Sequence, residues 1–192
     1  MSKQQAKRNS YPTLQKKIIL HLAQSTPQTI HKTAKQIEKD YKSSHYAFDA
    51  LRKKGLIKQV TSKPYRGREF PQFWLTELGV SLALSLRAEP QTILRRTIEI
   101  YPENRDLQFV IEAVPILGKN ALDMLYLIAL NKGVIKQGDL TSIFAIQMQK
   151  RLTPAQIRRF ITVLKKYPIP YQQCVNCISQ TRKNLRELSD LL

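Results

Sequence analysis

An abrupt change of periodicity at Gly55 most constrains what this chain can fold into. In YKSSHYAFDALRKKGLIKQV (residues 41–60), one helical arc carries Ser44, Ala47, Phe48 and Leu51. Gly55 suits the left-handed position just beyond a helix end, and the residues after it follow a strand-like pattern. We therefore expect a polar turn over residues 41–43, then a helix that Ser43 or Ser44 caps and that ends before Gly55. A short strand over residues 56–60 should follow.

The flanking segments predict further elements of the same small unit. Leu14, Ile18 and Leu22 recur every four residues and predict a helix over residues 13–23. We expect Ile30 in a one-residue β-bridge before a second helix over residues 31–40. Residues 61–72 hold prolines, a glycine and charged side chains, which predicts a loop. FWLT should pair back as a second strand, and residues 77–88 should form a helix that is covered on all sides.

This order of elements, with the pieces ALRKKGLIKQV and FWLTELG, resembles a known DNA-binding fold. It is similar to the L-x-x-x-G-L-I … L-T-x-x-G core of winged-helix regulators of the MarR, PadR and archaeal types. The resemblance covers about residues 13–87 and implies a winged helix-turn-helix that binds double-stranded DNA. Thr33 and Ser44 depart from the pattern, because they stand where these families carry aliphatic residues. These two departures weaken the match to any one family more than they weaken the prediction of the fold.

The charge of the chain points to a polyanionic partner. It has 32 Lys and Arg against 14 Asp and Glu, a net charge of +18. Residues 1–87 hold 17 of those 32 basic side chains and only 5 of the 14 acidic ones. Such an excess favours nucleic acid or an acidic membrane face. Residues 1–12 are expected to be a flexible basic arm, which is either a solvated tail or a segment that lies along DNA.

The expected helix before Gly55 turns a hydrogen-bonding front away from its apolar arc. A helix in the major groove needs this division, because the apolar back fixes its angle while the front reaches base edges. The expected base contacts are Ser43, His45, Tyr46 and Asp49. The expected phosphate contacts are Lys42, Arg52 and Lys53. The carboxylate of Asp49 would accept a hydrogen bond from a cytosine amino group or orient Arg52 or Lys53. The alternative is that this front is only the solvated side of a core helix.

The stretch SKPYRGREF predicts a basic hairpin tip around Gly67. Lys63, Arg66 and Arg68 would lie along the backbone or in the minor groove, where an inserted arginine senses groove width. Tyr65 would pack against a sugar or brace the loop. The alternative is a loop that only keeps the protein in solution.

The second half of the chain predicts helices throughout and resembles no family. The expected segments are 90–101, 105–117, 120–131, 139–151, 154–167 and 171–192, separated by prolines and glycines. ALDMLYLIAL (residues 121–130) is apolar on nearly every side and should be the central helix of a bundle. The predicted fold class is therefore mainly α, with a winged helix-turn-helix over 13–88 and an all-α domain for dimerisation or an effector over 89–192.

A homodimer is expected, because one short helix contacts too few base pairs to select an operator. A stripe in the C-terminal tail suits packing on a partner helix, or docking within the same chain; it consists of Ile178, Leu185, Leu188 and Leu192. The segment Glu77–Ala88 is the second candidate for the dimer interface.

Catalytic, metal and membrane functions find little support in the sequence. Cys174 and Cys177 have the spacing of metal ligands, but structural zinc needs four, so only a site shared across a dimer would be complete. A redox pair and two ordinary helical cysteines are the other interpretations. No nucleotide-binding, hydrolase or zinc-protease motif occurs, so we expect no enzyme and no cofactor. No apolar run would span a membrane and no leader pattern opens the chain, so we expect a cytoplasmic protein.

These features together predict a dimeric, sequence-specific transcription regulator that binds double-stranded DNA. The expected recognition helix spans residues 43–54 and the expected wing spans residues 61–72. A chromatin-like or replication-associated protein that coats DNA without sequence preference is the first alternative. An assembly adaptor that uses the same fold for protein contacts is the second.

Overall fold

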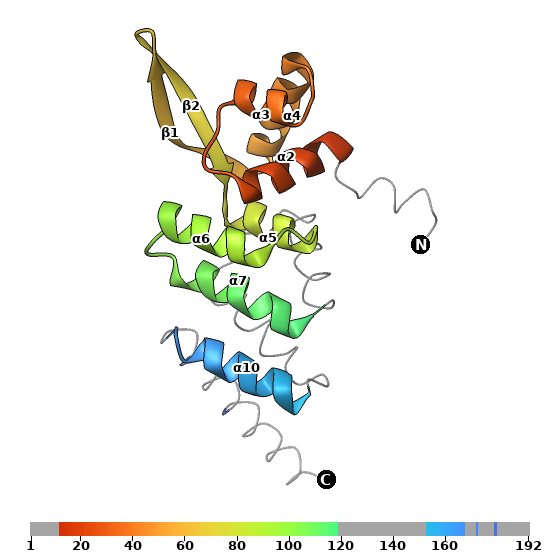
Figure 1. Cartoon of the computed structure of the whole chain (residues 1–192), viewed down its shortest axis with the longest axis vertical. Helices are drawn as coiled ribbons and strands as arrows, with labels where there is room; N and C mark the ends of the chain where they lie inside the picture. The colour runs from red at the N-terminus through yellow and green to blue at the C-terminus, as the bar shows by residue number, and fades with distance from the viewer. Residues whose placement is uncertain (1–11, 119–152, 168–171, 173–178, 180–192) are drawn as a thin grey trace, which may run out of the picture.

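The computed structural model describes residues 12–118 and 153–167, together with Gln172 and Ser179. These residues form helices and one two-stranded antiparallel sheet, which agrees with a mainly helical fold class. The elements are α2 (Thr13–Gln24), α3 (Ile30–Gln36), α4 (Tyr41–Lys53), β1 (Ile57–Tyr65), β2 (Arg68–Leu75), α5 (Glu77–Ser85), α6 (Pro90–Ile100), α7 (Arg105–Leu117) and α10 (Pro154–Leu164). Figure 1 shows α2, α3 and α4 beside the β1–β2 hairpin, which projects away from them. Helices α5, α6, α7 and α10 are stacked on the other side of α2.

Helix α2 has nearly the predicted bounds, whereas α3 begins one residue earlier and ends sooner than predicted. The side chain of Thr29 accepts a hydrogen bond from the backbone N–H of Lys32 and so caps α3. The predicted continuation to residue 40 is wrong, because Glu38 has a left-handed φ of 56° that ends the helical path. The predicted bridge at Ile30 is also displaced: Gln28 forms it, with Phe73 of β2.

Helix α4 begins earlier than predicted because Asp40 caps it. An Asp40 carboxylate oxygen accepts from the backbone N–H of Ser43 at 2.7 Å, and this bond holds the pKa of the carboxyl below its ordinary value. The predicted turn over 41–43 and the predicted cap at Ser43 or Ser44 are therefore wrong. A carboxylate at this position also complements the positive end of the helix dipole. At the other end, Gly55 has the expected left-handed φ, of 68°.

The hairpin is longer than predicted, since most of residues 61–72 belong to strands rather than to a loop. Its tip is a two-residue turn in which Arg66 and Gly67 both have positive φ, of 49° and 73°, as a tight hairpin turn requires. Pro64 and Pro71 are paired within the strands. A two-stranded sheet tolerates them, because each strand has one unpaired edge where a missing N–H costs nothing. A bulge interrupts the register between Gln59 and Thr61.

The Thr76 hydroxyl and several backbone groups join the end of α4, the base of the hairpin and the start of α5. The Thr76 hydroxyl donates to the Gly55 carbonyl oxygen at 2.6 Å and accepts from the backbone N–H of Gly79. The backbone N–H of Thr76 donates to the Leu56 carbonyl oxygen at 3.0 Å. A Cβ on Gly79 would lie 2.0 Å from that same oxygen, so only glycine fits there. Helix α5 is buried from Gly79 to Leu84, as predicted.

The helices after α5 share the hydrophobic core of the N-terminal elements. Trp74 is fully buried and its indole N–H donates to the carbonyl oxygens of Leu22 and Ser25. The Tyr101 hydroxyl, at the end of α6, donates to the Leu75 carbonyl oxygen at 2.7 Å. Helices α6 and α7 match their predicted segments closely, and α10 ends before its predicted end at 167. The basic arm up to residue 11 and the helices expected over 120–131 and 139–151 lie outside the described residues. The same holds for nearly all of residues 171–192.

Candidate nucleic-acid interface

Helix α4 separates a buried back from an exposed front, as its periodicity predicts. The back consists of Ser44, Ala47, Phe48 and Leu51. The front consists of exposed or half-exposed side chains: Lys42, Ser43, His45, Tyr46, Asp49, Arg52 and Lys53. Every residue that the sequence assigns to base or phosphate contact on this helix therefore reaches solvent.

Contacts along the back of α4 fix how its front is presented. The Phe48 ring meets the Phe73 ring of β2 with centroids 5.6 Å apart and planes at 70°, an edge-to-face arrangement. The Lys54 ammonium, just past the end of α4, donates to the Gln15 side chain of α2 at 3.0 Å. Helix α4 is thus attached to both α2 and the hairpin, and its front has a set orientation relative to the hairpin.

Asp49 is the acidic member of the front and lies between two cationic or ionisable side chains. Its carboxylate is 3.4 Å from His45 Nδ1 and 3.5 Å from Arg52 Nη2. All three side chains are well exposed, so these pairs add little to stability. Their effect is positional, because Asp49 holds Arg52 along the helix. This contact agrees with the predicted orienting role, with Arg52 rather than Lys53 as the partner.

A cleft of about 280 Å³ lies between α4 and β2, beside the contact of the Phe48 and Phe73 rings. His45, Asp49 and Arg52 line its α4 side, and Pro71 and Phe73 line its hairpin side. The front of α4 and the outer part of the hairpin therefore border one concave surface that carries both signs of charge.

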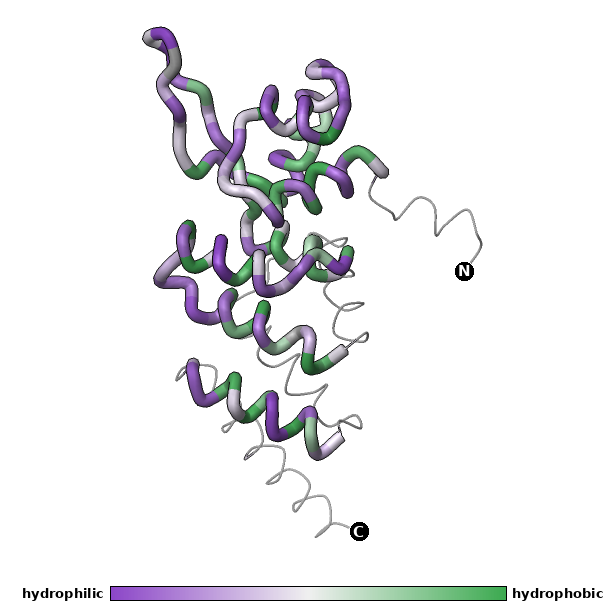
Figure 2. The backbone as a smooth tube through the Cα atoms, in the orientation of Figure 1, coloured by the Kyte–Doolittle hydropathy of each residue, from purple (hydrophilic) through white to green (hydrophobic). Residues whose placement is uncertain are grey.

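The hairpin tip has the predicted basic character. Lys63, Arg66 and Arg68 are exposed around the turn, and Figure 2 shows hydrophilic residues gathered there. Near the tip, Ser62 and Glu69 form a side-chain hydrogen bond across the two strands. The Tyr65 side chain lies outside the described part of the molecule, so its predicted bracing role stays a prediction.

Four exposed or half-exposed rings on α3 and α4 form contacts that the sequence pattern does not predict. His31 of α3 meets Tyr41, Tyr41 meets His45, and His45 meets Tyr46. The sequence predicts Tyr41 in a turn, whereas the structure places it in the first turn of α4, between His31 and His45. The nearest sequence signal is the spacing of Tyr41 and His45, which share one face if the helix starts early.

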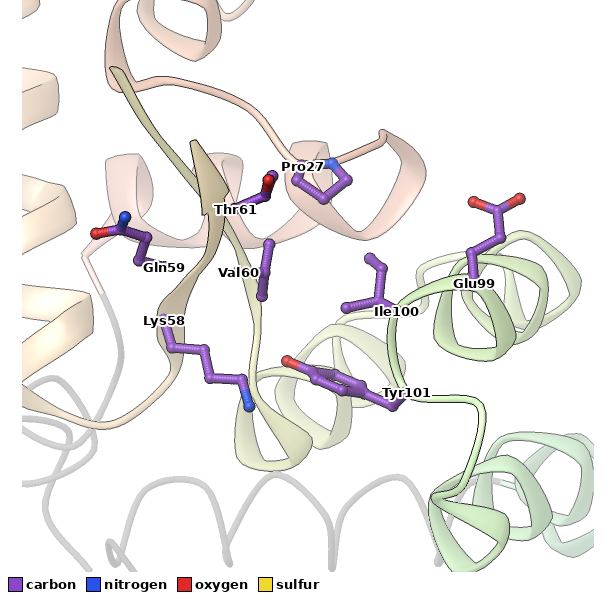
Figure 3. A pocket seen from close by; sticks show the side chains of 8 residues that line it. All are labelled: Pro27, Lys58, Gln59, Val60, Thr61, Glu99, Ile100 and Tyr101. Carbon is purple, nitrogen blue, oxygen red and sulfur yellow. The ribbon is translucent and has the colours of Figure 1, made fainter. Parts of the chain in front are cut away.

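A second hollow, of about 510 Å³, lies between the base of the hairpin and the end of α6 (Figure 3). Val60, Thr61 and Pro27 face Ile100 across it, and the Lys58 ammonium lies 4.6 Å from the centre of the Tyr101 ring. Burial raises the pKa of the Tyr101 phenol, and nearby Glu77 raises it further. Lys58 and Tyr101 are far apart in the sequence, and no motif joins them.

Within the described residues, no helix has both the length and the apolar character to cross a bilayer. No group of three His, Cys, Asp or Glu side chains gathers in that part of the chain in a way that would hold a metal ion. Cys174 and Cys177 lie outside it, so their predicted interpretations stay open.

Comparison of the whole chain with protein-family models, with curated proteins and with solved structures finds no match.

Proposed function

We propose that this protein is a sequence-specific transcription regulator that binds double-stranded DNA as a dimer through a winged helix-turn-helix. In this proposal α4 enters the major groove and the β1–β2 hairpin is the wing on the adjacent backbone or minor groove. It acts without catalysis in the cytoplasm. The observation that carries the proposal is the division of α4 into a buried back and a front of hydrogen-bonding side chains.

The order of elements and their junction support the winged-helix assignment. Among the described residues, α2 and α3 precede α4, a hairpin and α5 follow it, and a bridge joins residue 28 to β2. The motif residues Gly55 and Thr76, on which the family resemblance rests, meet through a hydrogen bond. The motif thus has a physical role in this chain, because it sets the angle at which the hairpin leaves α4.

The basic hairpin tip supports a second contact with DNA. Arg66 and Arg68 stand at the end of a projecting hairpin, where they can reach phosphates or a minor groove beside the one that α4 occupies. Phosphate contacts give affinity and register, whereas the front of α4 would supply base contacts.

A dimer is part of the proposal because one α4 would contact only a short half-site. The apolar residues of α5 are buried within this chain, which leaves its segment little apolar surface for a partner. We therefore retain the tail stripe, which includes Leu185 and Leu188, as the proposed interface. Leu185→Asp combined with Leu188→Asp should halve the mass in solution, measured by light scattering.

Selection of bound duplexes from a random pool, at low and moderate salt, tests the proposal directly. A regulator should enrich a short inverted repeat whose half-sites are centred about ten base pairs apart or a multiple of that. A protein that coats DNA, which the net charge of +18 favours as the second candidate, would enrich no sequence. Failure to bind any duplex at low salt would exclude both.

A further inference from the structure

Four rings on α3 and α4, of which that of His45 is half-buried and the other three are exposed, form one continuous strip, which we call the aromatic strip. It consists of His31, Tyr41, His45 and Tyr46. The ring centroids are 6.3 Å apart for His31 and Tyr41, 5.9 Å for Tyr41 and His45, and 6.4 Å for His45 and Tyr46. The strip thus runs from α3 onto the front of α4.

The tyrosine rings of the aromatic strip lie outside the hydrophobic core. Tyr41 is 53% exposed and Tyr46 is 64% exposed, although tyrosine rings are largely apolar. Contiguous aromatic surface left in water costs free energy and marks a contact site. The rings make up most of the apolar area of both side chains, so their faces are the feature that an aromatic ligand would use.

Exposed lysines adjoin the rings of the strip in the sequence, on α3, on the connection and on α4. Lys32 and Lys35 of α3, Lys39 of the connection and Lys42 of α4 are all exposed. Rings beside lysines suit a strand whose bases stack on the rings while its phosphates meet the cations. Bases inside a duplex have their faces covered by neighbouring base pairs, so only unpaired bases offer a free face to a ring.

We propose that the aromatic strip binds unpaired nucleobases of a single-stranded stretch of nucleic acid. The proposal rests on the proposed function for the nature of the partner, since both use the front of α4. It adds a second substrate class: a duplex that is open beside the α4 contact, or a single strand alone. In this proposal an unpaired base would stack on the ring of Tyr46.

Fluorescence anisotropy with dye-labelled strands tests this inference on the full chain. The probes are a 15-nucleotide oligo(dT), a 15-nucleotide oligo(U) and a 15-base-pair duplex. The matched variants are Tyr46→Phe, which keeps the ring, and Tyr46→Leu, which keeps apolar bulk without it, each also combined with the same change at Tyr41. Thermal unfolding of each variant confirms that it is folded.

Wild type and the Phe variants should bind oligo(dT) with affinities within about twofold of each other. Each Leu substitution should weaken that binding about tenfold, because stacking on one aromatic side chain contributes about that much affinity. A preference for oligo(dT) or for oligo(U) supports the inference and shows whether the ligand is single-stranded DNA or RNA. Equal binding of the two also supports it, because it indicates contact through the bases rather than through the sugars. Arg66→Ala with Arg68→Ala should weaken duplex binding more than oligo(dT) binding.

Leu variants that bind oligo(dT) like wild type would overturn the inference, as would a wild type that binds duplex but neither single strand. The second result would leave the proposed function intact. Ring-dependent binding of oligo(dT) without any duplex binding would support the inference and contradict the proposed function. The experiment therefore distinguishes the failure of one proposal from the failure of the other.

Discussion

The Thr76 hydroxyl donates a 2.6 Å hydrogen bond to the carbonyl oxygen of Gly55, across 21 residues of sequence. This bond joins the end of α4 to the start of α5 and closes the base of the hairpin between them. Gly79, packed against the Leu56 carbonyl, completes the junction. The orientation of the hairpin relative to α4 therefore depends on this junction as well as on the contact between the Phe48 and Phe73 rings.

Gly79→Ala should destabilise the protein strongly. Its Cβ would meet the Leu56 carbonyl oxygen at 2.0 Å, and backbone must move to relieve that contact. We expect a loss of about 3 kcal/mol in the free energy of unfolding. Thr76→Ala should cost about 1–2 kcal/mol through the lost cap. The exposed Thr162→Ala on α10 is the control and should change stability by less than about 0.5 kcal/mol. Urea unfolding measures all three, and a neutral Gly79→Ala would contradict the described junction.

Ser44→Ala should stabilise the protein. The Ser44 hydroxyl is fully buried and has no hydrogen-bond partner within residues 12–118 or 153–167. Removing it ends a desolvation cost of about 1 kcal/mol, and alanine also favours the helix. Thr33→Val is the matched comparison, because the buried Thr33 hydroxyl donates to Gln28 Oε1 at 3.3 Å. Thr33→Val should leave the free energy of unfolding unchanged or lower it. If Thr33→Val raises it as Ser44→Ala does, hydrogen bonding does not explain the difference between these two buried polar residues.

Tyr101 should make the fold sensitive to alkali. Burial raises the pKa of its phenol in the folded state, whereas the unfolded chain loses this proton near pH 10. The unfolded state then binds fewer protons than the folded one, so this stabilisation is complete below about pH 10 and is lost as the pH rises. In Tyr101→Phe the fall in unfolding free energy above that pH should be shallower. Chemical denaturation at several pH values measures it, and because both proteins share the same lysines, lysine titration cancels in the comparison.

The hairpin arginines should contribute to the salt dependence of duplex binding. A dimer that neutralises about eight phosphates should show a log–log slope of affinity against salt near −7. Arg66→Ala or Arg68→Ala removes one phosphate contact per protomer and should make that slope shallower by about two per dimer. Arg159→Ala, at an exposed position on α10, is the control. An unchanged slope in both hairpin variants would exclude the hairpin as a wing.

Asp49→Asn should separate specificity from affinity. The substitution removes the negative charge beside Arg52, so affinity for random duplexes should rise. Preference for the selected sequence should fall about tenfold, since one base contact provides about 1–3 kcal/mol of discrimination. Competition binding with selected and random duplexes gives both quantities. If affinity rises while no preference exists in either protein, coating of DNA is the better description.

Several features of the fold were predictable because their causes are local. The left-handed Gly55, the buried arc of α4 and the bounds of α6 and α7 follow from periodicity and from residues that stop helices. The helix starts were harder to place. Asp40, Ser43 and Ser44 are all good caps, and the early end of α3 decided among them by leaving Asp40 free to cap α4.

The length of the hairpin was not predictable from composition. Pro64 and Pro71 are typical of loops, yet a two-stranded sheet accommodates both. The aromatic strip was not predictable either, because it depends on where α4 starts. Contacts such as that of Lys58 with Tyr101 join distant segments and need the packed fold to appear.

The bulge at Val60 adds to β1 one residue that has no partner in β2. A bulge bends the strand that carries it and increases its local twist. Because β2 continues without interruption, the residues beyond the bulge still face as their β2 partners do, and the extra residue changes only the direction in which the outer hairpin extends. Deletion of Val60 would therefore straighten the hairpin and move its basic tip relative to α4, while the base of the hairpin stays anchored to the core.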